Sequence, residues 1–196
     1  MTRSASTPSP AVRGLTGSPV GATGPLEPLV GPLIAVIAAA FYWWAGADQT
    51  GTDAFVPLAS AFLSGRLSLP GPWPTWIEVV PRPGGGYDVP FPPGPALLVL
   101  PLVALLGPTG IDSSGGAAIA GGATAWLLWG LLGRLDLPTH PRLALTVAWC
   151  LGSEILWAGA TGGTHLWAQL CGAAFALGAI RLLVDEVRDC YAALGV

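Results

Sequence analysis

Four apolar runs dominate the pattern of hydrophobic and polar positions along the chain. Each run approaches or reaches the length of about 20 residues that an α-helix needs to cross the hydrocarbon of a bilayer. A polar, proline-rich segment at 48–114 separates the first run from the second. The pattern therefore predicts an all-α integral membrane protein with spans at about 29–47, 115–133, 143–159 and 166–184.

The segment 48–114 contains two shorter helical patterns. Asp53 precedes apolar residues at helical spacing, which predicts an amphipathic helix at about 53–65 with Asp53 as its N-cap. A second apolar stretch is interrupted by prolines and has about half the length of a span. It predicts a kinked interfacial or re-entrant helix at about 95–107.

Composition points to the same environment. The chain is 52% hydrophobic and 10% charged, whereas soluble domains carry about 25% charged residues. A net charge of −3 offers no basic face for a nucleic acid. Residues 1–28 are rich in Ser, Thr, Pro and Gly and predict a disordered tail, and the charged segment 185–196 predicts a second tail.

The cysteines show no metal-ligand spacing, and their number is odd. Cys150, Cys171 and Cys190 lie in or beside apolar runs, so we interpret them as buried apolar side chains. No nucleotide-binding or zinc motif occurs, and we expect no metal or cofactor. Gly84-Gly85-Gly86 predicts a turn.

The end of the first run carries two signals. Tyr42, Trp43 and Trp44 are expected at the headgroup level, which amphipathic rings prefer. Ala45-Gly46-Ala47 also fits a signal-peptidase site. The long tail before the run and the two tryptophans favour a retained span.

The arginines favour one orientation. Four spans with an internal N-terminus place six arginines on the cytoplasmic side and leave Arg66 and Arg82 outside. A five-span chain with an exported N-terminus gives the same division of arginines between the two sides, but it requires 95–107 to span. We therefore expect a plasma-membrane protein with both termini in the cytoplasm and 48–114 on the external face.

Charged side chains of this external segment are candidates for chemistry. Asp53 is either a simple helix cap or a general base whose pKa is raised by partial burial. Arg66 and Arg82 either hold a phosphate group or form loop ion pairs with Glu78 or Asp88.

Two further polar residues lie near the membrane-embedded runs. Glu154 falls inside the third predicted span, where an acidic side chain costs about 2.5–3.5 kcal/mol and should face other helices or a wet cavity. His165 follows a short external turn, and a polar pair of the two side chains is one arrangement open to them, for packing or for function.

Two strings of residues carry a resemblance to a known family. The first runs from Asp53 and Phe55 to Gly65-Arg66-Leu67, and the second is Tyr87-Asp88-Val89-Pro90-Phe91-Pro92-Pro93-Gly94-Pro95-Ala96. With the flanking spans, they make residues 29–184 similar to the N-terminal part of bacterial GT-C membrane glycosyltransferases, the group that contains protein O-mannosyltransferase-like enzymes.

The resemblance implies a polyprenyl-phosphate-linked sugar donor and inverting transfer to an acceptor hydroxyl on the external face. It implies an aspartate of the first external loop as base, and Asp53 is the best match, with Asp88 as second candidate. Arg66, Arg82, Glu154 and His165 are then candidates for substrate binding. Members of the family have many more spans, so the resemblance implies a truncated or partial fold that further helices complete.

Two alternatives come from the same residues. The chain can be a non-catalytic membrane subunit or homodimer that uses the small side chains of 115–122, since such a face lets helices approach closely. A small transporter is the other alternative. It rests on Glu154 alone, and the chain shows no inverted repeat.

Overall fold

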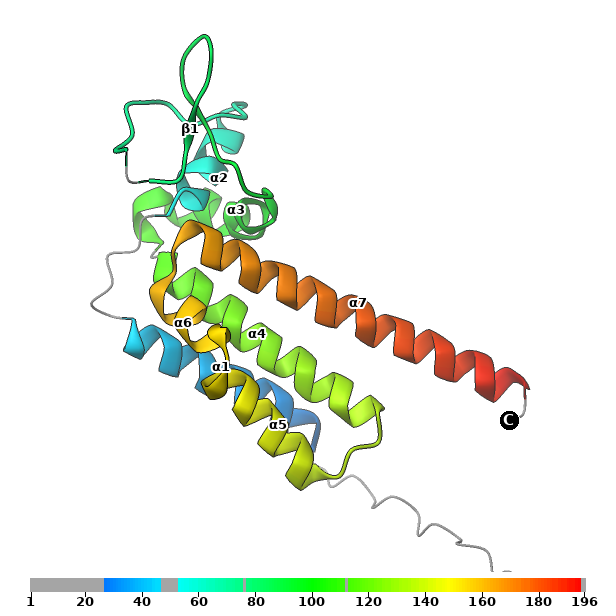
Figure 1. The fold of residues 1–196 in the computed structure, drawn as a ribbon. Helices are drawn as coiled ribbons and strands as arrows, with labels where there is room; N and C mark the ends of the chain where they lie inside the picture. The colour runs from blue at the N-terminus through cyan, green and yellow to red at the C-terminus, as the bar shows by residue number, and fades with distance from the viewer. Residues whose placement is uncertain (1–26, 47–52, 76, 112, 195–196) are drawn as a thin grey trace, which may run out of the picture.

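The computed structural model describes residues 27–46, 53–75, 77–111 and 113–194. These residues are mostly helical, and two layers are visible (Figure 1). A long bundle contains α1, α4, α5, α6 and α7, and a smaller loop layer containing α2, α3 and a short hairpin covers one end of it. The bounds are α1 Glu27–Ala45, α2 Phe55–Leu63, β1 Val80–Pro81, β2 Tyr87–Asp88, α3 Gly94–Leu106, α4 Ser113–Arg134, α5 Thr139–Gly152, α6 Glu154–Thr161 and α7 Thr164–Leu194.

Three of the helices, α1, α4 and α7, are long and apolar enough to cross a membrane. The pair α5 and α6 meets the same criterion only if the two are counted as one span, and they are bent by 54°. These helices correspond in order to the four predicted spans. The apolar α3 is too short to span, in agreement with the prediction for 95–107. Residues 1–26 of the predicted tail lie outside the described residues, and Glu27 already belongs to α1.

The span predicted at about 143–159 corresponds to two helices, α5 and α6, because the backbone breaks at Ser153. Ser153 is extended, with φ −123° and ψ 176°, and its hydroxyl accepts the N–H of Ile155 at 3.2 Å. The break frees carbonyl groups at the end of α5, and such groups need other donors when they are buried. Tyr42 supplies one, since its hydroxyl donates to the Cys150 carbonyl at 3.0 Å.

Tyr42 differs from Trp43 and Trp44, the neighbouring aromatic residues at the end of α1. Its side chain is fully buried, whereas both tryptophans are exposed. The ring lies against Gly121 of α4 and Gly159 of α6, where a Cβ would approach it to 2.8 Å and 2.7 Å. The hydrogen bond and the glycine contacts together hold the tyrosine inside the bundle.

Small residues make α4 the central helix of the bundle. A Cβ at Gly116 would lie 2.5 Å from the Trp167 ring of α7, and a Cβ at Gly122 would lie 2.5 Å from the Ala35 carbonyl oxygen of α1. Such short distances exclude a side chain at either position without a shift of the neighbour. The small-residue face predicted at 115–122 is thus occupied, at these glycines, by helices of the same chain.

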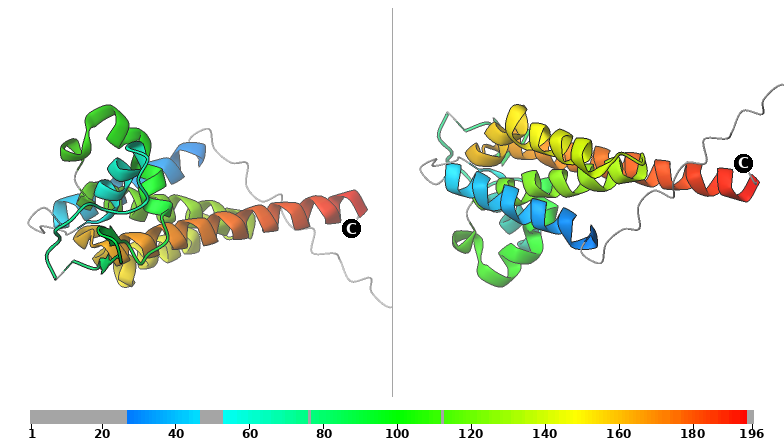
Figure 2. Two further views of the ribbon diagram at one scale, coloured as in Figure 1. Left: turned by 90° about the horizontal axis from the view of Figure 1, so that it is seen from above. Right: turned by 90° about the horizontal axis from the view of Figure 1, so that it is seen from below.

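The tail predicted from residue 185 onward is helical as far as Leu194. Figure 2 shows this part of α7 extending beyond the other helices. Asp185 pairs with Arg134 at the end of α4, and Arg188 donates to the Arg134 carbonyl at 2.7 Å. These contacts attach the first turn of the extension, and residues with good helix propensity continue it.

The cysteine prediction is confirmed in part. Cys150 and Cys171 are buried, but Cys190 is exposed because it lies on the α7 extension. All three are free thiols.

The loop layer departs from an all-α fold by one short hairpin. Strands β1 and β2 pair antiparallel with Val80 opposite Asp88. The predicted glycine turn is confirmed, since Gly84, Gly85 and Gly86 have φ of 92°, 102° and 85°, values that L side chains rarely adopt.

Leu69 extends the pairing with an isolated bridge to Tyr87. The Leu69 backbone N–H donates to the Tyr87 carbonyl at 2.8 Å, and the Leu69 carbonyl accepts the Tyr87 N–H at 2.9 Å. The Leu69 side chain is buried. The hairpin is thereby joined to the apolar core of the layer.

Candidate functional site at the junction of the loop layer and α7

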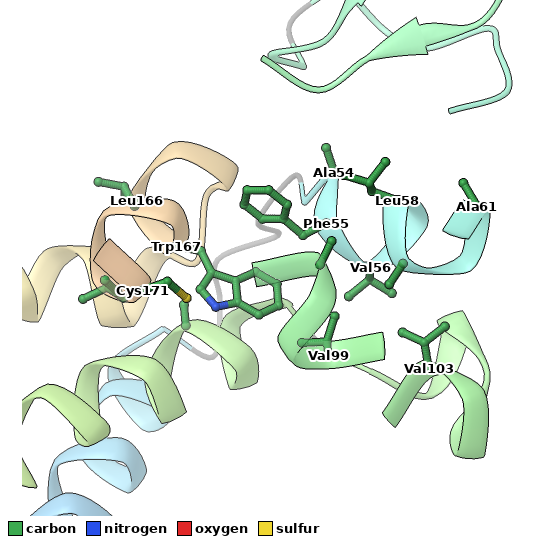
Figure 3. Close-up of a cluster of buried hydrophobic side chains, with 14 of the residues drawn as sticks. Ala54, Phe55, Val56, Leu58, Ala61, Val99, Val103, Leu166, Trp167 and Cys171 are labelled. Carbon is green, nitrogen blue, oxygen red and sulfur yellow. The ribbon is translucent and has the colours of Figure 1, made fainter. Parts of the chain in front are cut away.

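The loop layer meets α7 through a cluster of buried apolar side chains from α2, α3 and α7 (Figure 3). Phe55 and Trp167 face each other edge to face, with ring centroids 5.7 Å apart and an interplanar angle of 87°. The backbone N–H of Ala54 donates to the Thr164 hydroxyl at 3.2 Å. The first turn of α2 and the first turn of α7 are therefore held together.

Asp53 lies at this junction, immediately before α2. One carboxylate oxygen accepts the N–H of Phe55 at 2.6 Å, and the other accepts the N–H of Val56 at 3.0 Å. These are two of the first N–H groups of the helix, which have no partner within it. The predicted capping contact is confirmed, although the helix begins at Phe55, two residues after the aspartate.

The junction also changes the acidity of Asp53. Burial raises the pKa of its carboxyl from 3.8 to about 6, although the two backbone hydrogen bonds oppose the rise. An ionised carboxylate has about four acceptor sites, so each oxygen retains capacity after the capping bonds. A carboxylate with a pKa near 6 can accept a proton at neutral pH and release it again.

His165 follows Thr164 and contacts the loop layer as well. Its Nδ1 lies 3.1 Å from a carboxylate oxygen of Glu78, and its ring centroid lies 6.4 Å from that of Phe91. His165 and Glu78 are half-exposed, with side-chain exposures of 45% and 49%. His165 thus pairs with Glu78 and not with Glu154, the partner that the sequence left open.

Glu154 is exposed and begins α6, directly after the break at Ser153. A carboxylate in the first turn of a helix is favoured by the helix dipole. Among the residues that the structure describes, it takes part in no ion pair. Glu154 is therefore not packed among the other helices of the described residues, and whether it faces a wet cavity stays a prediction.

The remaining candidates lie on the surface of the loop layer. Arg66 follows α2, and its N–H donates to the Ala61 carbonyl at 2.9 Å. Arg82 lies in the hairpin turn, and Asp88 is on β2. All three side chains are exposed. Neither arginine forms an ion pair with Glu78, Asp88 or any other residue in the described ranges.

Sequence reasoning missed two residues that build the junction. Thr164 and Trp167 reach α2 across more than a hundred residues, and no local pattern indicates such a contact. Across the described ranges, no group of three or more His, Cys, Asp or Glu side chains is placed to hold a metal ion.

Comparisons of the chain with known protein families, with characterised proteins and with solved structures give no match. The architecture itself defines a class. Over the residues that the structure describes, the chain is a mostly helical protein with three helices that are long and apolar enough to cross a membrane, and a loop layer at one end of the bundle.

Proposed function

We propose that this chain is an integral membrane protein of the GT-C glycosyltransferase type, and that Asp53 is the general base of its external active site. The donor is a polyprenyl-phosphate-linked sugar, and the acceptor is a hydroxyl group. The observation that carries the proposal is the half-buried Asp53 carboxyl, whose pKa is raised to about 6 at the junction of α2 and α7.

The charges support a cytoplasmic location for the end opposite the loop layer. Arg134, Arg142, Arg181 and Arg188 lie toward that end, on α4, α5 and α7. Arginine is enriched on the cytoplasmic side of membrane proteins. With α1, α4, α7 and the bent pair α5–α6 as spans, the loop layer with Asp53 is external and both termini are cytoplasmic.

The proposed reaction is a direct displacement. The acceptor oxygen attacks the anomeric carbon of the sugar, its proton passes to the Asp53 carboxylate, and the bond from that carbon to the phosphate oxygen breaks. Polyprenyl phosphate leaves with the bonding electron pair. Arg66 and Arg82 of the loop layer, and the pair that Glu78 forms with His165 of α7, are the groups that can bind phosphate and sugar. Asp88 is the second candidate for the base.

A specific observation favours a second candidate function, a non-catalytic membrane subunit. Both carboxylate oxygens of Asp53 already accept N–H groups of α2. A purely structural cap makes the same contacts. The two functions differ in whether Asp53 needs its charge or only its hydrogen-bonding geometry.

The test compares Asp53→Asn with the wild-type chain in native membranes, where any further subunit is present. Asparagine is as good a helix cap as aspartate, so α2 should persist. It cannot take up the proton, and loss of a general base slows a reaction by about 10²–10⁴-fold. Transfer of radiolabelled mannose or glucose from its polyprenyl-phosphate carrier to protein or water is the measured quantity.

Asp189→Asn, which removes an exposed carboxylate at the other end of the molecule, is the matched control and should retain activity. Loss of glycosyl transfer in Asp88→Asn but not in Asp53→Asn would indicate that Asp88, on the hairpin, is the general base. Equal transfer by Asp53→Asn and wild type, or no transfer above membranes lacking the chain, would favour the non-catalytic subunit.

A further inference from the structure

A long apolar groove runs along the side of the bundle between α3, α4 and α7. Its volume is about 920 Å³. Leu98 and Leu102 of α3 border it near the loop layer, and Phe175 and Leu182 of α7 line its length. All lining side chains other than three charged ones are apolar or small.

The groove follows α4 and α7, which run side by side so that contacting residues keep the same separation in sequence. Gly116 of α4 lies against Trp167 of α7, and Arg134 pairs with Asp185 at the same separation of 51 residues. From Trp167 to Asp185 the groove extends about 27 Å at the helical rise of 1.5 Å per residue. This length is close to the hydrocarbon thickness of about 30 Å.

The charges of the groove lie at one end only. Arg134, Arg181 and Asp185 line the end farthest from the loop layer. Arg134 and Asp185 form an ion pair. Arg181 forms no ion pair or hydrogen bond with any residue the structure describes, and its guanidinium lies across Gly130, where a Cβ would be 2.7 Å from Nη1. This end of the groove therefore carries two cationic side chains and one anionic side chain, an excess of one positive charge.

A second pocket continues from this end around α4. It has a volume of about 480 Å³, and Arg134 and Arg181 line it together with Arg142 and Glu27. Glu27 is bonded to Arg142 at 3.0 Å, so it does not neutralise Arg181. The nearby Asp136 lies 3.8 Å from Arg188. The apolar groove thus shares Arg134 and Arg181 with a second pocket whose lining has an excess of positive charge.

We propose that this groove, which we call the α3–α4–α7 groove, binds an anionic glycerophospholipid. One acyl chain lies along the groove, and the phosphate lies against Arg181, in the leaflet away from the loop layer. Basic pockets between membrane helices attract anionic headgroups in this way. A neighbouring helix in the groove would leave Arg134 and Arg181 with Asp185 as their one shared counterion at this end, unless it carried a carboxylate at that depth. The inference rests on the membrane location proposed above, but not on glycosyl transfer.

The experiment uses the full chain in detergent, with dioleoyl-phosphatidylglycerol and dioleoyl-phosphatidylcholine added in separate titrations. Native mass spectrometry measures the lipid bound at each concentration. The wild type should bind phosphatidylglycerol more tightly. Arg181→Gln should weaken that binding by at least about fivefold, the effect of one basic residue near an anionic surface, and leave phosphatidylcholine binding little changed.

Two glycines of α7 provide a matched pair of variants that leaves the charged side chains of the groove unchanged. Gly178 lines the groove and Gly172 does not, and a Cβ at either position meets no atom within 4 Å. Both positions should therefore tolerate leucine. Gly178→Leu should weaken binding of both lipids by filling the groove, whereas Gly172→Leu should bind as wild type does.

Equal binding of the two lipids by the wild type, or an unchanged preference in Arg181→Gln, would overturn the proposal. So would a Gly178→Leu variant that keeps lipid binding but loses self-association, since the groove would then be a helix-packing face. Asp53→Asn should bind lipid as wild type does, so a failure of glycosyl transfer leaves this test intact.

Discussion

At the loop-layer end, α2 and α7 meet through apolar side chains, whereas at the opposite end the helices meet through arginines and carboxylates. Phe55 and Trp167 are both buried and pack edge to face. Arg142 is also buried, yet it donates to the Trp129 carbonyl at 2.8 Å and to Glu27 at 3.0 Å. Its guanidinium also lies 3.8 Å from the centre of the Trp129 ring.

The difference separates two sources of stability. Apolar packing depends on shape and area, and a lost side chain leaves a cavity. A buried guanidinium depends on its acceptors, and removal of the cation leaves those acceptors without donors. The two ends should therefore respond differently to truncation, to pH and to loss of charge.

The largest effect is expected from Trp167→Ala. The ring fills the space between Phe55 and Gly116, so its removal should lower the free energy of unfolding by about 3–5 kcal/mol. Unfolding in mixed micelles measures this. Trp157→Ala is the control, because Trp157 is 61% exposed and its loss leaves no cavity. Similar losses in both variants would show that the loop-layer end is not held by packing at Trp167.

A smaller effect is expected from pH at the same end. The folded pKa of Asp53, about 6, lies above the ordinary value of 3.8, so the folded state holds the proton more tightly. The resulting stabilisation is complete below about pH 4 and is lost as the pH rises through the folded pKa, by no more than about 2–3 kcal/mol.

The difference in unfolding free energy between wild type and Asp53→Asn isolates this contribution, because other carboxyl groups titrate equally in both proteins. The difference should fall from pH 4 to pH 7 and then level off. A difference that rises over this range would mean that the capping bonds outweigh burial and that the pKa of Asp53 is lowered.

At the opposite end, Arg142→Met should lower the free energy of unfolding by about 1–3 kcal/mol, because it leaves the Trp129 carbonyl and Glu27 without their donor. Arg188→Met is the matched control on α7. The Arg188 side chain is 54% exposed, and its loss should change stability by less than about 0.5 kcal/mol. An Arg142 variant as stable as the control would remove the contrast between the two ends.

The sequence alone determined the features that depend on near neighbours. The apolar runs predicted α1, α4 and α7, and the prolines predicted that α3 is short. The position of Asp53 before helical spacing predicted its cap, and three glycines predicted the hairpin turn. Helical periodicity, capping and turn chemistry act over about four residues, so a single sequence displays them.

Tertiary structure alone decided which distant groups meet. The Ala54–Thr164, Tyr42–Cys150 and Arg142–Glu27 contacts join residues separated by 110, 108 and 115 positions. Each donor had several possible acceptors along the chain, and only the packing of the helices against one another selected one. The raised pKa of Asp53 likewise follows from the folded structure, because burial of its carboxyl is the largest cause of the shift.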